Sequence, residues 1–184
     1  TLLEHGIYDI EKVIGIMAKD YCIDKDTPKT ALVMNCNPFT LGHQFLIEEA
    51  ARNSREVLVF IVQEERSLFP FGVRYDLVKR GTEHLKNVKV IPGGEYIISS
   101  ATFPSYFLRK EDERLRAFTE LDAGIFGRHF CRMLNIKSRY VGEEPYCSVT
   151  SQYNETLERV LKSYNVNLVK IARKKHNHFD ISAS

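Results

Sequence analysis

The chain has 184 residues, enough for one ordinary domain with a real hydrophobic core, and its 43% apolar and 27% charged residues are typical of a soluble globular protein. A formal net charge of +2 is too small to indicate nucleic-acid binding, and no apolar run approaches the ~18 residues of a membrane span. The first residues lack the pattern of a signal peptide, so we expect a cytoplasmic protein without nucleic-acid or membrane partners.

The N-terminal segment reads as a helix followed by a linker. Apolar residues recur at helical spacing over residues 9–21, and Asp9 can cap the start of that helix. Residues 24–29 are polar and contain Pro28, which is typical of a linker.

From residue 30 onward, strand patterns alternate with helical patterns. The run Val57–Val62 is apolar at every position, which predicts a strand buried on both faces. The predicted strands are Thr30–Cys36, Val57–Val62, Val88–Ile91, a short strand around Tyr140-Val141, and Val166–Ile171. The predicted helices between them cover residues 42–53, 73–85, 111–134 and 151–163.

This alternation predicts an α/β fold, with a Rossmann-like, doubly wound parallel sheet of five strands and helices on both faces. In such sheets ligands bind beyond the carboxyl ends of the strands, close to the point where the strand order reverses. The segment Asn35–His43, which follows the first strand, is therefore the first place to look for a site.

That segment has the features that a triphosphate site needs. A helix beginning there presents free backbone amides and the positive end of its dipole, and Gly42 permits close approach of a phosphate. The imidazole of His43 can donate to phosphate oxygens, and Thr40 offers a hydroxyl at the same mouth. A Gly-His pair alone usually marks only a helix start; the strand-turn-helix setting favours the functional interpretation.

The same residues resemble a known signature. Asn37-Pro38-Phe39-Thr40-Leu41-Gly42-His43 is similar to the HxGH motif of the nucleotidyltransferase superfamily, with Thr40 at the usual first His and Asn37 where many members have Asp. The longer string Met34–His43 resembles the citrate lyase ligase family in particular. Further strings that fit this family are Arg66–Phe71, Ser100–Leu108, Val141–Pro145 and Ile181–Ser184, so the resemblance runs from about residue 30 to the end.

The resemblance implies an ATP-dependent ligase. Such an enzyme forms acetyl-AMP and pyrophosphate from ATP and acetate, then passes the acetyl group to the thiol of the prosthetic group on the citrate lyase acyl carrier subunit. Mg²⁺ would arrive with ATP, held mainly by phosphate oxygens and water. Two alternatives stay open: an adenylyltransferase acting on a phosphopantetheine or nucleotide substrate, and a non-catalytic nucleotide-binding module.

The resemblance also suggests a division of the chain and a set of site residues. Because the family usually carries a preceding domain, we expect residues 1–29 to be its trailing helix and linker, and residues 30–184 to be the nucleotidyltransferase-like domain. The expected catalytic residues are Thr40, His43 and Arg66. The expected nucleotide-binding residues are Asn35, Asn37, Phe39, Gly42, Gly142, Glu143, Ser182 and Ser184.

Several of these residues have a simpler interpretation. Ser182 and Ser184 resemble a second phosphate motif of the superfamily, but without that resemblance an ordinary helix N-cap serine is the favoured interpretation. Glu143 could accept from ribose hydroxyls or lie in a solvated acidic turn. Arg74, like Arg66, could neutralise phosphate charge, or it could be a surface charge or pair with Asp76 or Glu65.

Three further groups remain outside the core prediction. Ser99–Leu108 could line the pocket for acetate or the acyl carrier, or belong to the core, and the basic run Arg173–His178 could hold pyrophosphate or be a solvated loop. The four cysteines form no CxxC pair, which argues against zinc, and we expect reduced thiols rather than two disulfides. Cys36 and Cys147 lie near the predicted site loops but lack an identifiable activating base, so we interpret them as structural.

Overall fold

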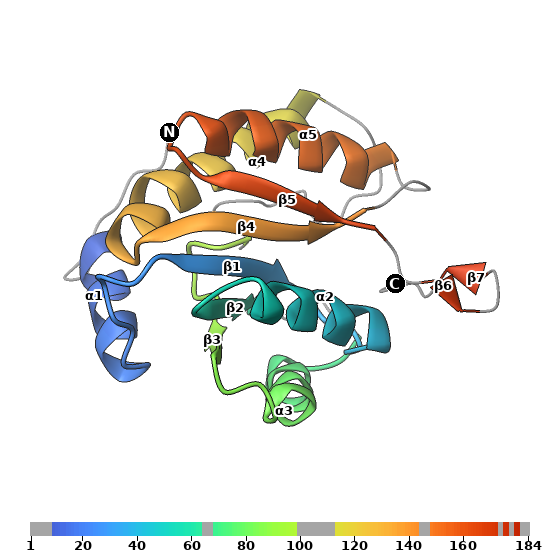
Figure 1. The fold of residues 1–184 in the computed structure, drawn as a ribbon. Helices are drawn as coiled ribbons and strands as arrows, with labels where there is room; N and C mark the ends of the chain where they lie inside the picture. Colours follow the sequence, from blue (N-terminus) through green and yellow to red (C-terminus); the bar gives the residue numbers. More distant parts are fainter. Residues whose placement is uncertain are drawn as a thin grey trace.

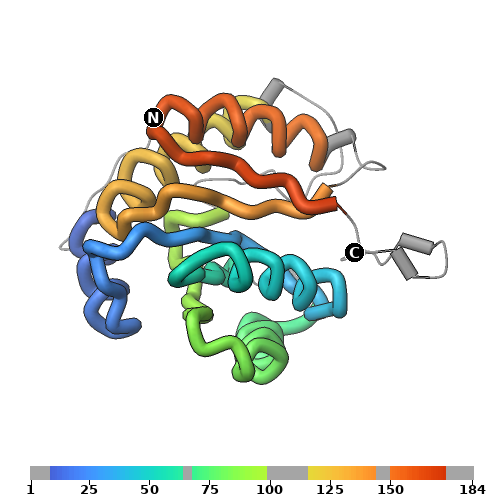
Figure 2. Tube along the Cα trace, in the orientation of Figure 1, coloured from blue at the N-terminus to red at the C-terminus, as the bar shows by residue number. Residues whose placement is uncertain are grey.

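The structure is a computed structural model that describes residues 9–63, 68–98, 113–143, 148–172, 175–176 and 179–180. Figure 1 shows a central sheet with helices on both faces, and the chain path can be followed in Figure 2. The sheet has five strands in the order β3-β2-β1-β4-β5, and every neighbouring pair is parallel. This confirms the predicted doubly wound α/β fold.

The strands and helices alternate along the chain as expected. The strands of the sheet are β1 (Lys29–Met34), β2 (Val57–Ile61), β3 (Val88–Pro92), β4 (Ile136–Gly142) and β5 (Asn167–Ile171). The helices are α1 (Ile10–Asp20), α2 (Leu41–Arg52), α3 (Phe71–Thr82), α4 (Glu113–Ile125), the π-helical stretch η1 (Phe126–Cys131) and α5 (Ser148–Lys162). A two-residue antiparallel pair, β6 (Lys175–His176) and β7 (Phe179–Asp180), follows β5.

The strand order reverses between β1 and β4, where the chain has gone to one side of β1 for β2 and β3 and returns to its other side. β1 is hydrogen-bonded to β2 from Thr30 to Met34 and to β4 through Lys29 to Ala31. The carboxyl ends of β1 and β4 therefore flank the switch point, which is where ligands bind in open parallel sheets.

Each face of the sheet has its own hydrophobic cluster, because side chains of a strand alternate between faces. In β2, Val57, Val59 and Ile61 pack with residues of α2 and α3. Leu58 and Phe60 join the opposite cluster, which α1, α4, η1 and α5 cover. All five residues of β2 are fully buried, as the unbroken apolar run predicted.

Helix α1 packs into the second of these clusters rather than standing apart. Asp9 caps it by accepting a hydrogen bond from the backbone amide of Lys12 at 2.8 Å. Ile10, Ile14 and Met17 are buried in the cluster that also contains Phe126 and Phe130 of η1. The predicted division at residue 29 stays a prediction, since the packing of α1 does not define where a domain begins.

Some element boundaries differ from the predicted ones. The first strand stops at Met34 rather than Cys36, where the backbone turns through a positive φ of 51° and leaves the sheet ladder. The predicted helix over 111–134 is α4 followed by the π-helical η1, and β4 is longer than its short apolar core suggested. None of the helices in the described part of the chain has both the length and the apolar character needed to cross a membrane.

Candidate functional site

The segment between β1 and α2 forms the centre of the candidate site, at the switch point. It leaves the sheet after Met34, passes through the cis peptide bond between Asn37 and Pro38, and enters α2 at Leu41. In Figure 1 the carboxyl end of β1 and the start of α2 lie on the same edge of the sheet as the carboxyl end of β4. The structure therefore places the predicted HxGH-like motif where the fold positions ligands.

His43 lies in the first turn of α2 and is held by Thr40, the residue that precedes the helix. The Nδ1 atom of His43 accepts a hydrogen bond from the backbone N–H of Thr40 at 3.1 Å. The Thr40 hydroxyl lies 2.8 Å from the same Nδ1. Because a backbone N–H can only donate, Nδ1 is an acceptor, and a neutral imidazole must carry its proton on Nε2. The ring thus keeps one N–H donor for a ligand.

The ring of His43 is neutral over the physiological pH range. Burial lowers its pKa from 6.5 to about 4, because the charged imidazolium would lose hydration in this half-buried position. A neutral histidine contributes a directed Nε2–H donor to an anionic ligand rather than a full positive charge. This arrangement suits a group that must stabilise charge developing on a phosphate oxygen without exchanging protons with it.

The start of α2 adds backbone donors beside that ring. The first helical hydrogen bond runs from the amide of Gln44 to the carbonyl of Thr40 at 3.0 Å. The amides of Leu41 and Gly42 precede it and therefore have no acceptor inside the helix. Together with the positive end of the helix dipole, they form an arrangement that attracts phosphate groups.

Phe39, whose predicted role in nucleotide binding stays a prediction, packs against His43 of α2 and Gly81 of α3. Its ring stacks on His43 with a centroid distance of 6.1 Å and an interplanar angle of 25°. On its other side lies Gly81 of α3, where an added Cβ would come within 2.3 Å of Phe39 Cε1. Phe39 therefore supports the imidazole from behind. Sequence reasoning missed Gly81, although a glycine inside a helical pattern is a signal of close approach.

The buried guanidinium of Arg74 corrects the expectation that this residue meets phosphate or solvent. Arg74 is 0% exposed, so it is neither a surface charge nor a phosphate ligand. Its Nη1 donates to the carbonyl of Asn35 at 2.7 Å and to the carbonyl of Val62 at 2.8 Å, and its Nε donates to the carbonyl of Phe69 at 2.9 Å. One side chain thus ties together the ends of β1 and β2 and the start of α3.

The two predicted asparagine ligands are part of the same framework. The side-chain oxygen of Asn35 accepts from Arg74 Nη1 at 3.0 Å, and that of Asn37 accepts from the backbone amide of Phe69 at 2.9 Å. Both side chains therefore hold the loop after β1 against the loop before α3. These hydrogen bonds fix the position of both side chains at the site, and their predicted role in nucleotide binding stays a prediction.

The loop after β4 reaches the same edge of the sheet. Gly142 ends β4, and its carbonyl accepts from Asn154 of α5 at 3.4 Å. Glu143 is exposed, and its backbone amide bonds to the carbonyl of Ile171 at the end of β5 at 3.0 Å. A Cβ on Gly142 would lie 4.0 Å from Leu46 of α2, so this loop adjoins the helix that carries His43.

Other predicted residues lie outside the described part of the chain. These are Arg66, Ser182, Ser184, Cys147, all of Ser99–Leu108, and Arg173, Lys174, Asn177 and His178 of the basic run. Their proposed roles stay predictions. Cys36 is buried, and burial raises its thiol pKa to about 12, which agrees with a structural rather than a nucleophilic role. Cys22 and Cys131 are free thiols as well.

Comparison with known proteins connects this geometry to a family. Residues 29–184 match the family model described as the citrate lyase ligase C-terminal domain. Citrate lyase ligase of Escherichia coli (strain K12) is 40% identical over 158 residues, which cover 83% of this chain and 45% of that protein. The ligase of Haemophilus influenzae is 37% identical over 159 residues, covering 84% of this chain and 48% of that protein. The chain thus spans about half the length of the curated relatives it matches.

The fold has a counterpart among solved structures. A pantoate-beta-alanine ligase from Francisella tularensis, solved as a complex with beta-gamma ATP and beta-alanine, superposes with a TM-score of 0.56 at 12% identity. The match covers 92% of this chain and 69% of that one. At such low identity the likeness establishes a shared α/β fold. From the family match and the two ligase relatives, the chain belongs to the citrate lyase ligase C-terminal domain family.

Proposed function

We propose that this chain is the ATP-binding and acid-activating part of a citrate lyase ligase. The observation that carries the proposal is the lock between Thr40 and His43, which leaves a neutral Nε2–H donor beside the first-turn amides of α2 at the switch point. The family relatives bear the ligase name, and the structural neighbour with this fold was solved as a complex with beta-gamma ATP and beta-alanine. These facts support ATP as the substrate.

In the proposed first step, a carboxylate oxygen of acetate attacks the α-phosphorus of ATP. The bond from that phosphorus to the bridging oxygen of the β-phosphate breaks, and pyrophosphate leaves with the electron pair. His43 and the amides of Leu41 and Gly42 would hold the phosphate oxygens and stabilise the charge that develops on them. Acetyl-AMP is the product that stays in the site.

In the proposed second step, the sulfur of the acyl carrier's prosthetic thiol attacks the acetyl carbonyl carbon. AMP leaves with the bonding pair, and the thiol proton passes to solvent. The Glu143 loop, at the same edge of the sheet, is positioned to accept from the ribose hydroxyls of the nucleotide. Thr40 would orient His43 through its backbone N–H, which donates to Nδ1, and its hydroxyl lies 2.8 Å from the same nitrogen at the mouth of the site.

In this proposal Mg²⁺ would enter the site bound to ATP rather than to a metal site of the protein. Within the described ranges, no group of three or more His, Cys, Asp and Glu side chains is placed to hold a metal ion. The donors that the site presents are N–H groups, which bind phosphate oxygens and not cations. When bound, Mg²⁺ would neutralise charge on the leaving pyrophosphate, coordinated by phosphate oxygens and water.

Acetate-dependent exchange of labelled pyrophosphate into ATP tests the first step directly. We expect label to enter ATP only when acetate is present. Exchange that requires a phosphopantetheine or nucleotide acceptor, and not acetate, would instead identify an adenylyltransferase. His43→Ala should lower the exchange rate by about 10²-fold, about 2.7 kcal/mol, the effect of removing one oxyanion donor.

His84→Ala is the matched control, because His84 is an exposed histidine near the end of α3 that lies 3.5 Å from Glu48. It should leave the exchange rate unchanged. Unaltered exchange in His43→Ala would remove this residue from the mechanism. ATP binding without exchange, measured on a chain of the relatives' full length, would identify a non-catalytic nucleotide-binding module.

A further inference from the structure

A cavity lies at the edge of the sheet opposite the candidate site around His43. It has a volume of about 730 Å³, and four segments line it: α1, η1, the start of β4 and the turn between α5 and β5. β4 has seven residues, so its two ends are roughly 20 Å apart. The cavity is therefore too far from His43 to belong to the same site, and its volume suits a small-molecule ligand.

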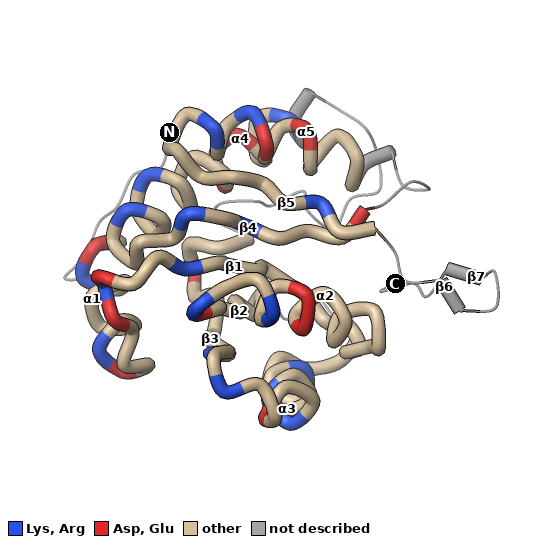
Figure 3. The backbone as a smooth tube through the Cα atoms, in the orientation of Figure 1, with Lys and Arg blue, Asp and Glu red and all other residues tan. Residues whose placement is uncertain are grey.

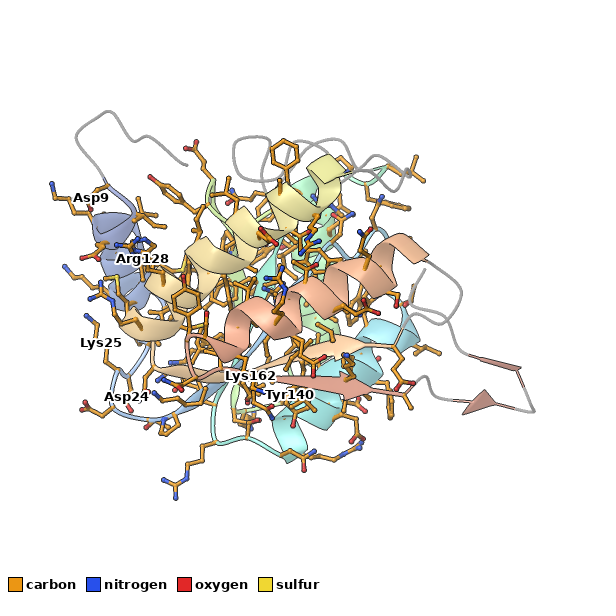
Figure 4. The ribbon with its side chains drawn as sticks, turned by 90° about the horizontal axis from the view of Figure 1, so that it is seen from above. Asp9, Asp24, Lys25, Arg128, Tyr140 and Lys162 are labelled. Atoms are coloured by element: carbon orange, nitrogen blue, oxygen red, sulfur yellow. The ribbon has the colours of Figure 1, made fainter. Side chains whose placement is uncertain are left out.

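The walls of this cavity are positively charged. Arg128, Arg132 and Lys137 line it, against the single carboxylate of Glu11. Figure 3 shows Lys and Arg positions on η1 and β4 at this end of the molecule, and Figure 4 labels Arg128 there. Glu11 is already paired with Arg132 through Nη2. Arg128 and Lys137 are exposed, so the cavity keeps a surplus of positive charge.

One polar atom in the wall is buried without a hydrogen bond. His129 Nδ1 has no hydrogen-bond partner among the described residues, and Glu11 Oε1 lies 3.7 Å away from it. Such an atom costs free energy unless a ligand or water meets it. The Glu11 carboxylate therefore lies against both Arg132 and His129, so it is already engaged by two side chains of this wall.

Gly127 and Tyr164 form one wall of the cavity. Gly127 allows the Tyr164 ring to lie directly on η1, since an added Cβ would come within 2.4 Å of Tyr164 Cδ2. The ring remains 38% exposed and forms one wall. π-Helical segments such as η1 are often found at functional sites, because the widened turn re-aims side chains. Here Arg128, His129 and Arg132 all face the cavity.

We propose that this cavity binds a small, multiply charged oxyanion, either a polyphosphate or a polycarboxylate. Arginine recognises both chemistries through its planar array of N–H donors, and Lys137 adds a mobile point charge. Ser163 and Asn165 supply neutral hydrogen-bonding groups from the α5–β5 turn. The site is independent of the proposed acetate activation and would persist if that proposal failed.

Amide chemical-shift titrations of the 184-residue chain test the proposal, using tripolyphosphate and tricarballylate as separate probes. We expect at least one probe to shift the amides of Gly127, Tyr164 and Asn165. Binding of tripolyphosphate alone assigns the phosphate class, and binding of tricarballylate alone assigns the carboxylate class. Shifts at Gly42 and His43 report the nucleotide site, so the two sites are read separately.

The double variant Arg128→Gln/Lys137→Gln should weaken binding at this cavity by about tenfold or more, because two exposed charges leave. The control variant Arg80→Gln/Lys86→Gln also removes two exposed positive charges, one in α3 and one in the turn that follows it. It should leave the affinity for the probe unchanged. Lys137→Gln alone should give about a fivefold loss, which supplies a second measurement if the double variant folds poorly. No shift at these amides with either millimolar probe, or equal affinity in the charge variants, would overturn the proposal.

Discussion

At the scale of single residues, the candidate site depends on which nitrogen of His43 carries the proton. The backbone amide of Thr40 settles the matter by donating to Nδ1. The HxGH-like signature indicated that His43 matters, but its letters could not reveal the tautomer, because that depends on the geometry of the helix start. Thr40, which departs from the usual histidine, contacts the ring through its backbone N–H, which donates to Nδ1; its catalytic role stays a prediction.

The lowered pKa of His43 predicts a specific dependence of stability on pH. In the unfolded chain the ring titrates near 6.5, but in the folded protein only near 4. Between these values the unfolded state binds the proton and the folded state does not, so stability falls as pH drops through this window. The full loss below pH 4 is on the order of 3 kcal/mol.

Urea unfolding from pH 7.5 to 4 checks this, with His43→Asn as the comparison. The difference in unfolding free energy between the original protein and His43→Asn should be constant above pH 7. Below pH 6.5 the original protein should lose stability relative to the variant. A difference that stays flat to pH 4 would show that the imidazole titrates normally in the folded protein.

A second residue-scale prediction concerns the contact behind the imidazole. Gly81→Ala should displace Phe39, which an added Cβ would approach to 2.3 Å, and through it the stacked His43 ring. We expect the KM for ATP in the exchange reaction to rise about tenfold or less, and stability to fall by roughly 1–3 kcal/mol from overpacking.

Gly72→Ala is the matched control, because it lies in the same helix and an added Cβ there meets nothing within 4 Å. It should raise stability by up to about 1 kcal/mol, the usual difference in helix propensity, and leave the KM unchanged. If Gly81→Ala and Gly72→Ala have the same KM for ATP and the same stability, the contact between Gly81 and Phe39 does not affect the position of His43.

At the scale of elements, β1, β2 and α3 are joined at one edge of the sheet by the buried Arg74. Arg74→Met keeps the bulk of the side chain but leaves the carbonyls of Asn35, Val62 and Phe69 without these donors. Because buried unpaired groups are costly, we expect a loss of about 3 kcal/mol or more in unfolding free energy. Arg80→Met, on the exposed side of α3, should change it by less than about 0.5 kcal/mol.

Thermal or urea denaturation measures the loss of unfolding free energy in Arg74→Met. The nucleotide affinity of the folded variant provides a second measurement. If Arg74→Met is as stable as Arg80→Met, the three hydrogen bonds do not hold the loops together. Sequence patterns could not identify this role, because an arginine near the start of a helix usually lies at the surface. Burial of its guanidinium depends on carbonyls from two strands that are distant in sequence.

At the scale of the whole molecule, the apolar runs and their alternation with helices were enough to predict the parallel sheet and its helical layers. The Val57–Ile61 strand illustrates why, since its burial on both faces follows from an unbroken apolar run. The strand order places the β1 end beside the β4 end, which explains why Gly142 and the HxGH-like motif share an edge. The contacts of Phe39, Asn35 and Asn37 join different elements, and periodicity does not encode such contacts.

The place of α1 in the whole molecule can be tested by a pair of isoleucines. Ile14 is 0% exposed within the cluster beneath η1, whereas Ile16 is 48% exposed. Ile14→Ala should cost about 2–5 kcal/mol of unfolding free energy, and Ile16→Ala less than about 1. A single cooperative denaturation curve with these values would place α1 inside the folding unit. Equal, small effects would mean that α1 folds separately.

The tether at Arg74 also bears on how this motif could be transplanted. A designer who moves only the nine residues from Asn35 to His43 into another parallel sheet leaves behind the guanidinium that fixes the first of them. The portable unit is instead the pair of loops after β1 and β2 together with the opening turn of α3. In evolution, too, we expect substitutions in these three segments to be coupled, because a change in one alters the hydrogen bonds that the others make with it.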